Sequence, residues 1–235
     1  DLAVFASSIF PSRPALPMKN NFQSGEEERY RRQRERMVEE QLLNRGIRNE
    51  HVLAAMREVP RHRFVPPEDR PLSYADGPLP IGKGQTISQP YVVAAMTEAV
   101  DPAPGKRLLE VGTGSGYQAA VLAATGAEVY SIERVPELAA SARKVLESLG
   151  YSVHFSIGDG TLGWAGAAPF DGILVTAAPK ELPPAFANQL VEGGCLVIPV
   201  GAFEQTLYRY VKLPGGGLRS EALFSVRFVP LRNGE

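Results

Sequence analysis

A short glycine-rich segment carries the clearest chemistry in this sequence. Gly112, Gly114 and Gly116 alternate with other residues directly after an apolar run that ends at Val111. Glycines at such a turn let the backbone bend tightly and let a ligand approach it closely. A helix that starts after the turn would add free N–H groups and the positive end of its dipole. The spacing therefore predicts a ligand-binding loop between a strand and a helix.

Three acidic residues indicate which ligand this loop accepts. Glu110 precedes the loop, Glu133 ends the next apolar run, and Asp159 follows the run after that, beside Gly160. A carboxylate at Glu110 would repel a pyrophosphate but attract an ammonium group, and Glu133 can accept both hydroxyls of a ribose. Asp159 can accept a hydrogen bond from the amino group of an adenine. A ligand with an ammonium group, a ribose and an adenine but no phosphate is S-adenosylmethionine.

Other interpretations of the loop stay open at this point. A nicotinamide dehydrogenase would have a third glycine where this chain has Tyr117, and the acid at Glu110 also argues against it. The glycines can instead form a tight turn with no ligand, with the acids as solvated strand ends. A module that binds S-adenosylmethionine without catalysis is a further alternative.

The surrounding elements alternate between strands and helices from Lys106 onward. Apolar runs predict strands at 107–111, 128–133, 152–157, 172–176 and 195–200, and helical patterns lie near 116–124, 136–149 and 183–191. This alternation predicts an α/β fold: a doubly wound, mostly parallel, Rossmann-like sheet with helices on both faces. Two later runs, 206–213 and 222–229, flank a Pro-Gly-Gly-Gly turn and predict an antiparallel C-terminal hairpin.

The amino-terminal part has a different pattern. Residues 1–24 are predicted to form an extension, with prolines near its middle. Ser24 and Glu27 have the spacing of a capping box and predict a helix at about 25–45, which Gly46 ends. Asn49 can cap a second helix. We expect residues 25–235 to form one domain, with N-terminal helices at 25–105, a cofactor-binding core at 106–201 and C-terminal strands at 202–235.

The composition excludes several classes of protein. The 235 residues have a formal net charge of −1, which argues against charge-driven nucleic-acid binding. No apolar run is long enough for a transmembrane helix. The single cysteine, Cys195, excludes an intrachain disulfide and is expected to be a buried apolar residue. Three widely spaced histidines predict no metal site, and His62 is expected to be a surface or loop residue.

Segments outside the loop resemble a known family. Residues 74–90 read YADGPLPIGKGQTISQP, and the most specific part is the Gly-Gln-Thr-Ile-Ser-Gln-Pro run. The segments 59–66 and 196–201 are similar to further parts of the same family. From about Arg34 to Leu231 the chain resembles the protein-L-isoaspartate O-methyltransferases, which are class I S-adenosylmethionine-dependent methyltransferases. The resemblance implies methylation of the α-carboxylate of L-isoaspartyl residues in damaged proteins and peptides.

The resemblance also implies roles for particular residues. Ser88 falls on the catalytic serine of the family, and the segment around it covers the cofactor and the substrate. The implied cofactor contacts are Gln85, Thr86, Ile87, Ser88, Glu110, Gly112, Thr113, Gly114, Glu133, Asp159 and Gly160. The implied substrate contacts are Ser88, Val197, Ile198, Pro199 and Val200. The family further implies that the last strands are arranged differently from those of other class I methyltransferases. We expect a cytoplasmic monomer, although the extension leaves an exported form open.

The implied reaction needs few reactive groups. A carboxylate with an ordinary pKa is already ionised at neutral pH, so no general base is required. Ser88 would then position the acceptor through a hydrogen bond, although it can instead cap the helix predicted after Pro90. We expect no metal dependence and a nearly flat rate from about pH 6 to 8. A class I methyltransferase with another small-molecule or macromolecular acceptor is the alternative, and the segment from Gln85 to Pro90 argues against it.

Overall fold

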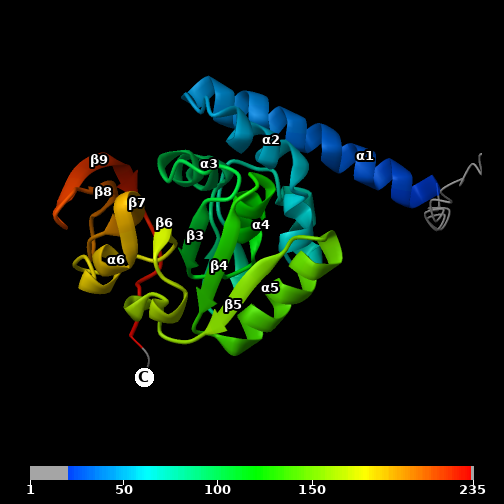
Figure 1. The fold of residues 1–235 in the computed structure, drawn as a ribbon. Helices are drawn as coiled ribbons and strands as arrows, with labels where there is room; N and C mark the ends of the chain where they lie inside the picture. Colours follow the sequence, from blue (N-terminus) through cyan, green and yellow to red (C-terminus); the bar gives the residue numbers. More distant parts are fainter. Residues whose placement is uncertain (1–20, 234–235) are drawn as a thin grey trace, which may run out of the picture.

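A seven-stranded sheet lies at the centre of the structure (Figure 1). The computed structural model describes residues 21–233. In the order β5-β4-β3-β6-β7-β8-β9, the first five strands are parallel to one another, and β8 pairs antiparallel with both β7 and β9. The strands are β3 (Arg107–Val111), β4 (Glu128–Glu133), β5 (Val153–Ile157), β6 (Phe170–Val175), β7 (Leu190–Val200), β8 (Gln205–Lys212) and β9 (Leu218–Val226). The predicted fold class is confirmed, including the antiparallel C-terminal strands.

Helices cover both faces of the sheet because alternate strand residues point to opposite sides. Leu108 belongs to one core, together with residues of α2 (Glu50–Glu58), α3 (Pro90–Ala99), α4 (Tyr117–Ala124) and α5 (Pro136–Leu149). Leu109 and Val111 belong to a second core with Phe186 of α6 (Pro184–Gln189). Central strands that are buried on both sides in this way explain the continuous apolar runs in the sequence.

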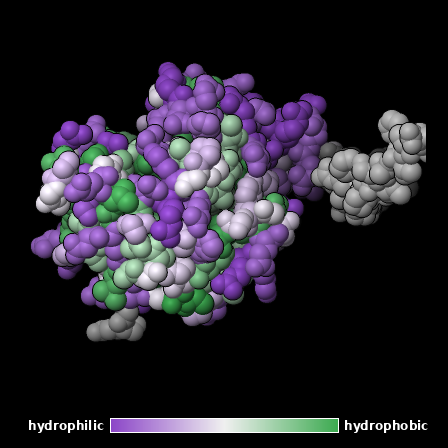
Figure 2. Space-filling model, in the orientation of Figure 1, coloured by the Kyte–Doolittle hydropathy of each residue, from purple (hydrophilic) through white to green (hydrophobic). Residues whose placement is uncertain are grey.

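The first helix begins earlier than the sequence predicts. Helix α1 spans Asn21–Arg36, so Ser24 lies inside it and not at its N-cap, because no residue between Asn21 and Ser24 breaks a helix. It continues as a π-helical segment at Met37–Leu42 and a 3-10 turn at Leu43–Arg45. Gly46, with φ +94°, ends it as predicted. Of the predicted extension 1–24, residues 1–20 lie outside the described part. Polar side chains cover the projecting part of α1 (Figure 2).

His62 is buried, so the prediction of a surface position is wrong. Its ring stacks on that of Tyr30 with centroids 4.0 Å apart, and Nδ1 lies 2.8 Å from the hydroxyl of Tyr74. Burial lowers the pKa of His62 to about 4, so the ring is neutral at physiological pH. The sequence does not reveal that α1 packs over this segment. Cys195, in contrast, is buried as expected.

A two-stranded hairpin precedes α3 and was not predicted. It consists of β1 (Leu79–Gly82) and β2 (Gln85–Ile87), which pair antiparallel. Lys83 at its tip has φ +54° and makes an ion pair of 2.6 Å with Glu137 of α5. The hairpin therefore reaches across to the amino end of α5 and places residues 85–88 beside the central sheet. Within residues 21–233, no helix has the length and apolar composition that a membrane crossing needs.

Asn49 caps α2 as predicted, and its loss should have a measurable cost. Its side-chain oxygen accepts hydrogen bonds from the backbone N–H groups of His51 (3.0 Å) and Val52 (3.2 Å). Asn49→Ala should lower the free energy of unfolding by about 1 kcal/mol, measured by urea denaturation. Asn49→Ser keeps a capping oxygen, so its free energy of unfolding should fall by clearly less. Equal losses for the two variants would contradict the capping role.

Candidate active site

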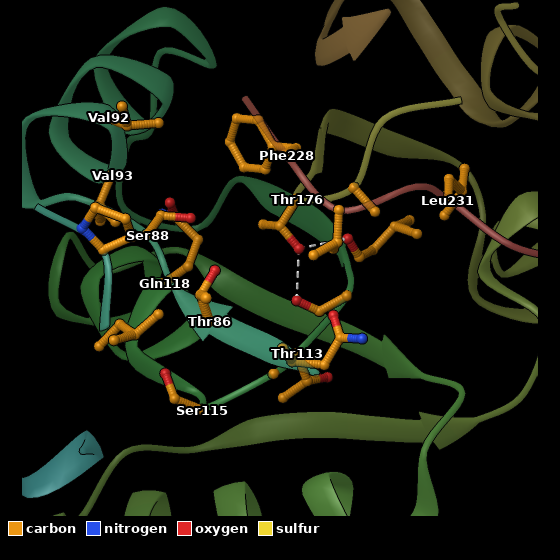
Figure 3. Close-up of a pocket in the computed structure, with 18 of the residues that line it drawn as sticks. Thr86, Ser88, Val92, Val93, Thr113, Ser115, Gln118, Thr176, Phe228 and Leu231 are labelled. Carbon is orange, nitrogen blue, oxygen red and sulfur yellow. Dashed lines mark hydrogen bonds between the residues drawn. The ribbon is translucent and has the colours of Figure 1, made fainter. Parts of the chain in front are cut away.

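A cavity of about 710 Å³ opens at the carboxyl ends of the central parallel strands. It lies where the strand order reverses between β3 and β6, which is the usual ligand site of an open α/β sheet. The hairpin and the start of α3 form one wall, and the segment from Phe224 to Arg232 forms the opposite wall. Figure 3 shows Ser88 and Val92 on the first wall and Phe228 and Leu231 on the second. The size is that of a pocket for a ligand as large as a nucleoside derivative.

The glycine loop forms the base of this cavity in the predicted strand-to-helix turn. Gly112, Gly114 and Gly116 have φ values of +98°, +52° and +87°, which other L-residues rarely adopt. A Cβ atom on Gly112 would lie 2.3 Å from Oγ1 of Thr176. That hydroxyl already donates to the carbonyl oxygens of Gly112 at 2.7 Å and Val111 at 3.0 Å. The loop conformation therefore depends on glycine at position 112.

Glu110 is one of the residues that line the cavity, and its carboxyl group is fully buried. Its Oε2 accepts a 2.5 Å hydrogen bond from the hydroxyl of Ser131, which itself lies 2.5 Å from Oγ1 of Thr113. Within the described residues, Oε1 of Glu110 has no hydrogen-bond partner. Burial raises the pKa of Glu110 to about 8, although the Ser131 hydrogen bond and the nearby backbone N–H of Ala119 oppose this shift. A cationic donor in the cavity would supply the missing partner.

Glu133 lies at the end of β4 and is held by backbone groups. Its Oε2 accepts from the N–H of Gly114 and its Oε1 from the N–H of Val135, both at 2.9 Å. These bonds fix the carboxylate against the glycine loop, and each oxygen keeps a second lone pair for a ligand hydroxyl. The sequence predicted both the strand end and the acid.

Ser88 lies on the cavity wall and does not cap the helix that follows it, which was the alternative role. The N-cap of α3 is Gln89, and no side chain caps that helix. Within the described part of the chain, no hydrogen bond of the Ser88 hydroxyl is formed. The capping interpretation is therefore wrong, because Ser88 lies one residue too early for it. Its hydroxyl is available to a ligand in the cavity.

The structure gathers most of the predicted site residues but not all of them. Those that line the cavity are Gln85, Thr86, Ile87, Ser88, Glu110, Gly112, Thr113, Gly114, Glu133 and Gly160. Asp159 does not line it; its Oδ1 accepts from the N–H and hydroxyl of Thr161 at 2.8 and 2.7 Å. Val197, Ile198 and Pro199 are buried in β7, and Val200 is partly exposed at its end. None of these four residues lines the cavity, so an acceptor contact from this segment would fall to Val200, outside the cavity lining.

Several cavity residues were not predicted. Gln118, on α4, donates to Oγ1 of Thr97 at 2.8 Å, and Thr176 follows β6. Phe228 and Leu231 belong to the segment after β9, which a backbone hydrogen bond between Leu231 and Ala178 holds near β6. Thr176 could have been found from the sequence, since it ends a predicted strand beside the glycine loop. Nothing in the sequence pointed to Phe228 or Leu231 as cavity residues.

The residues present fit S-adenosylmethionine. Glu110 offers an unpartnered buried oxygen to an ammonium group, Glu133 offers acceptors to ribose hydroxyls, and the glycines provide a close backbone cradle. Among residues 21–233, no cluster of three or more His, Cys, Asp or Glu side chains could hold a metal ion.

Solved structures agree with this fit. One protein-L-isoaspartate O-methyltransferase structure superposes with a TM-score of 0.76 at 30% identity, covering 84% of this chain and 65% of that chain. A structure from Plasmodium falciparum that is named for the same methyltransferase contains S-adenosyl-L-homocysteine. It has a TM-score of 0.74 at 26% identity and covers 86% of this chain and 99% of that chain. Fold and site thus define an S-adenosylmethionine-dependent methyltransferase of the α/β class.

Sequence comparison identifies the family. A sequence model of protein-L-isoaspartate(D-aspartate) O-methyltransferase (PCMT) matches residues 32–235. This chain belongs to that family. A protein-L-isoaspartate O-methyltransferase from Gloeobacter violaceus is 55% identical over 198 residues, or 83% of this chain and 96% of that protein. One from Opitutus terrae is 56% identical over 200 residues, or 84% and 86% of the two chains.

Proposed function

We propose that this enzyme transfers the methyl group of S-adenosylmethionine to the ionised α-carboxylate of L-isoaspartyl residues in damaged proteins, without a general base. The observation that carries the proposal is that one cavity is lined by Ser88, whose hydroxyl makes no hydrogen bond within residues 21–233, and by Glu110, whose buried Oε1 has no hydrogen-bond partner among the same residues. The first suits an anionic acceptor, and the second suits a cationic donor.

The chemistry requires alignment more than proton transfer. The sulfonium of the bound donor supplies an activated methyl group and a neutral leaving group. Ser88 donates a hydrogen bond to one acceptor oxygen and leaves the other oxygen to attack in line with the methyl–sulfur bond. Phe228, Leu231 and Val92 border the cavity with apolar surface, which excludes water from a step in which opposite charges cancel. Good alignment contributes several kcal/mol, up to roughly 7–11 kcal/mol in ideal cases.

The other predicted contacts complete the proposal. Glu110 binds the ammonium group, Glu133 binds the ribose hydroxyls, and Gly112, Thr113 and Gly114 contact the donor through their backbone. Residues 85–87 cover it, and Gly160 contacts the adenine. Asp159, which lies between β5 and Gly160, accepts a hydrogen bond from the adenine amino group. Val200 contacts the acceptor polypeptide.

Two measurements test the function. The enzyme should methylate an isoaspartyl hexapeptide and leave the aspartyl peptide of the same sequence unmodified. Calorimetry should show binding of S-adenosyl-L-homocysteine and no binding of NAD. Equal activity on both peptides, or activity only on a different class of acceptor, would overturn the assignment of the substrate.

Ser88→Ala should lower kcat by about 10- to 100-fold, because a hydrogen bond to a charged group is lost. The affinity for S-adenosyl-L-homocysteine should change less than about threefold, since Ser88 acts on the acceptor. Ser88→Thr keeps a hydroxyl and should lose less activity than Ser88→Ala. Full activity of the alanine variant would remove Ser88 from the mechanism.

The cellular setting is a separate part of the proposal. We expect a monomer that acts in the cytoplasm on isoaspartyl proteins and peptides, with no nucleic-acid or membrane partner. Light scattering after size-exclusion chromatography measures the oligomeric state. Fractionation of cells that express the full-length chain measures its location.

A further inference from the structure

Three side chains lie together at the cavity that Ser88 also lines. The guanidinium carbon of Arg45 lies 3.8 Å from the centroid of the Tyr91 ring. The centroid of the Phe224 ring lies 5.8 Å from that of Tyr91, and the two planes differ by 40°. All three residues line the same cavity as Ser88. They come from the turn before Gly46, the first turn of α3 and β9, so only the folded chain brings them together.

Arg45 is fixed relative to the serine. Its Nη1 donates to Oδ1 and Oδ2 of Asp76 at 3.1 and 3.0 Å. Oδ1 of Asp76 also accepts from Nε2 of Gln89 at 2.7 Å. Gln89 directly follows Ser88 in the chain. The Asp76 carboxylate therefore links the Arg45 guanidinium to the segment that contains Ser88.

The remaining donors of Arg45 are available. Within residues 21–233, no group accepts a hydrogen bond from its Nε or Nη2, and 40% of its side chain is exposed. A guanidinium stacked on an aromatic ring keeps its N–H groups pointing outward in its own plane. Arg45 therefore presents a fixed set of charged donors to whatever occupies the mouth of the cavity.

The chemistry of the acceptor indicates what lies there. Donor and acceptor charges meet in the interior of the cavity, whereas the polypeptide on either side of the reacting residue must leave through the mouth. Its side chains vary from one damaged protein to another, but its carbonyl groups do not. Arginine has five N–H donors and no acceptor, and hydrogen bonds from a charged donor are stronger than neutral ones.

We propose that Arg45 is a substrate-binding residue that donates hydrogen bonds to main-chain carbonyl groups of the acceptor polypeptide next to the methylated residue. The Tyr91 and Phe224 rings extend this surface along the polypeptide. The inference rests on the proposed function and concerns the acceptor side of the same cavity.

Steady-state kinetics of Arg45 variants test the inference. Arg45→Gln should raise the KM for an isoaspartyl octapeptide by about 10- to 100-fold. The kcat and the Kd for S-adenosyl-L-homocysteine should stay within about twofold of wild type, since neither reacting group is touched. Arg45→Lys keeps the charge but lacks the planar fork, so its KM should also rise, by a smaller factor. Arg219→Gln, an exposed arginine of β9 that does not line the cavity, is the matched control and should leave the KM unchanged.

Peptide length separates this role from others. The loss in the Arg45→Gln variant should shrink as the octapeptide is shortened toward the isoaspartyl residue. An unchanged KM, a loss independent of peptide length, or an equal loss of cofactor affinity would each overturn the inference. Melting temperatures check folding, and Arg45→Lys carries the same test if the glutamine variant is unfolded. A wild-type enzyme inactive on isoaspartyl peptides would refute the proposed function itself, whatever the variants do.

Discussion

Gly112→Ala should abolish tight cofactor binding and destabilise the fold. The backbone at position 112 has φ +98°, where a Cβ atom costs about 1–2 kcal/mol. The added atom would also lie 2.3 Å from Oγ1 of Thr176, far inside van der Waals contact. Thr176 cannot rotate away without breaking its two hydrogen bonds to the loop backbone. The loop must therefore move, and with it the N–H of Gly114 that fixes Glu133.

We expect the Kd for S-adenosyl-L-homocysteine to rise at least 100-fold and the free energy of unfolding to fall by about 2–4 kcal/mol. Calorimetry and urea denaturation measure these two quantities. Gly158→Ala is the matched control at the same edge of the sheet. Its Cβ would meet only Cδ1 of Ile132, at 3.9 Å, with no positive φ, so both quantities should remain close to wild type. Cofactor affinity within about fivefold of wild type in Gly112→Ala would show that the loop tolerates a side chain.

The middle of the sheet was predictable because strands β3, β4 and β6 are largely buried on both faces. The strands β3 and β4 and helix α5 begin and end where the apolar runs and Pro136 place them. The hairpin β1–β2 was missed because its strands have only four and three residues and the first contains Pro80, a residue that argues against a strand. Strand β7 begins at Leu190, five residues before the predicted start, because Phe170 pairs with Leu190 despite Gly193 and Gly194.

The cofactor side of the site was also predictable, since its residues follow consecutive strands. The acceptor side was not. Arg45, Phe224 and Phe228 reach the cavity only through the packing of the N-terminal turn and the last strand against α3. For Val197 and Ile198, the resemblance to the family implies contact with the substrate. Only the structure shows that their side chains are buried in the core.

Cofactor affinity should rise with pH between pH 6.0 and 7.5. Burial holds the pKa of Glu110 at about 8, and the charge of Glu133 nearby adds to this shift. The free enzyme therefore carries a proton on Glu110 in this range, while an ammonium group requires the carboxylate. Binding must release that proton, so the affinity should increase roughly 20-fold over these 1.5 pH units, about tenfold per unit well below the pKa. The amino group of the ligand stays mostly protonated below pH 7.5 and contributes little.

Glu110→Gln should remove this dependence, because a neutral amide neither titrates nor attracts a cation. At pH 7.5 the variant should bind the cofactor more weakly than wild type does, and the difference between the two affinities should become smaller toward pH 6.0. Calorimetry in two buffers of different ionisation enthalpy should show release of about one proton for wild type at pH 7 and none for the variant. Glu147→Gln, an exposed acid of α5 outside the cavity, should keep the wild-type slope. The expected flat rate from pH 6 to 8 then applies only at saturating cofactor, since the acceptor carboxylate does not titrate there. A wild-type affinity independent of pH would mean that Glu110 is already ionised in the free enzyme.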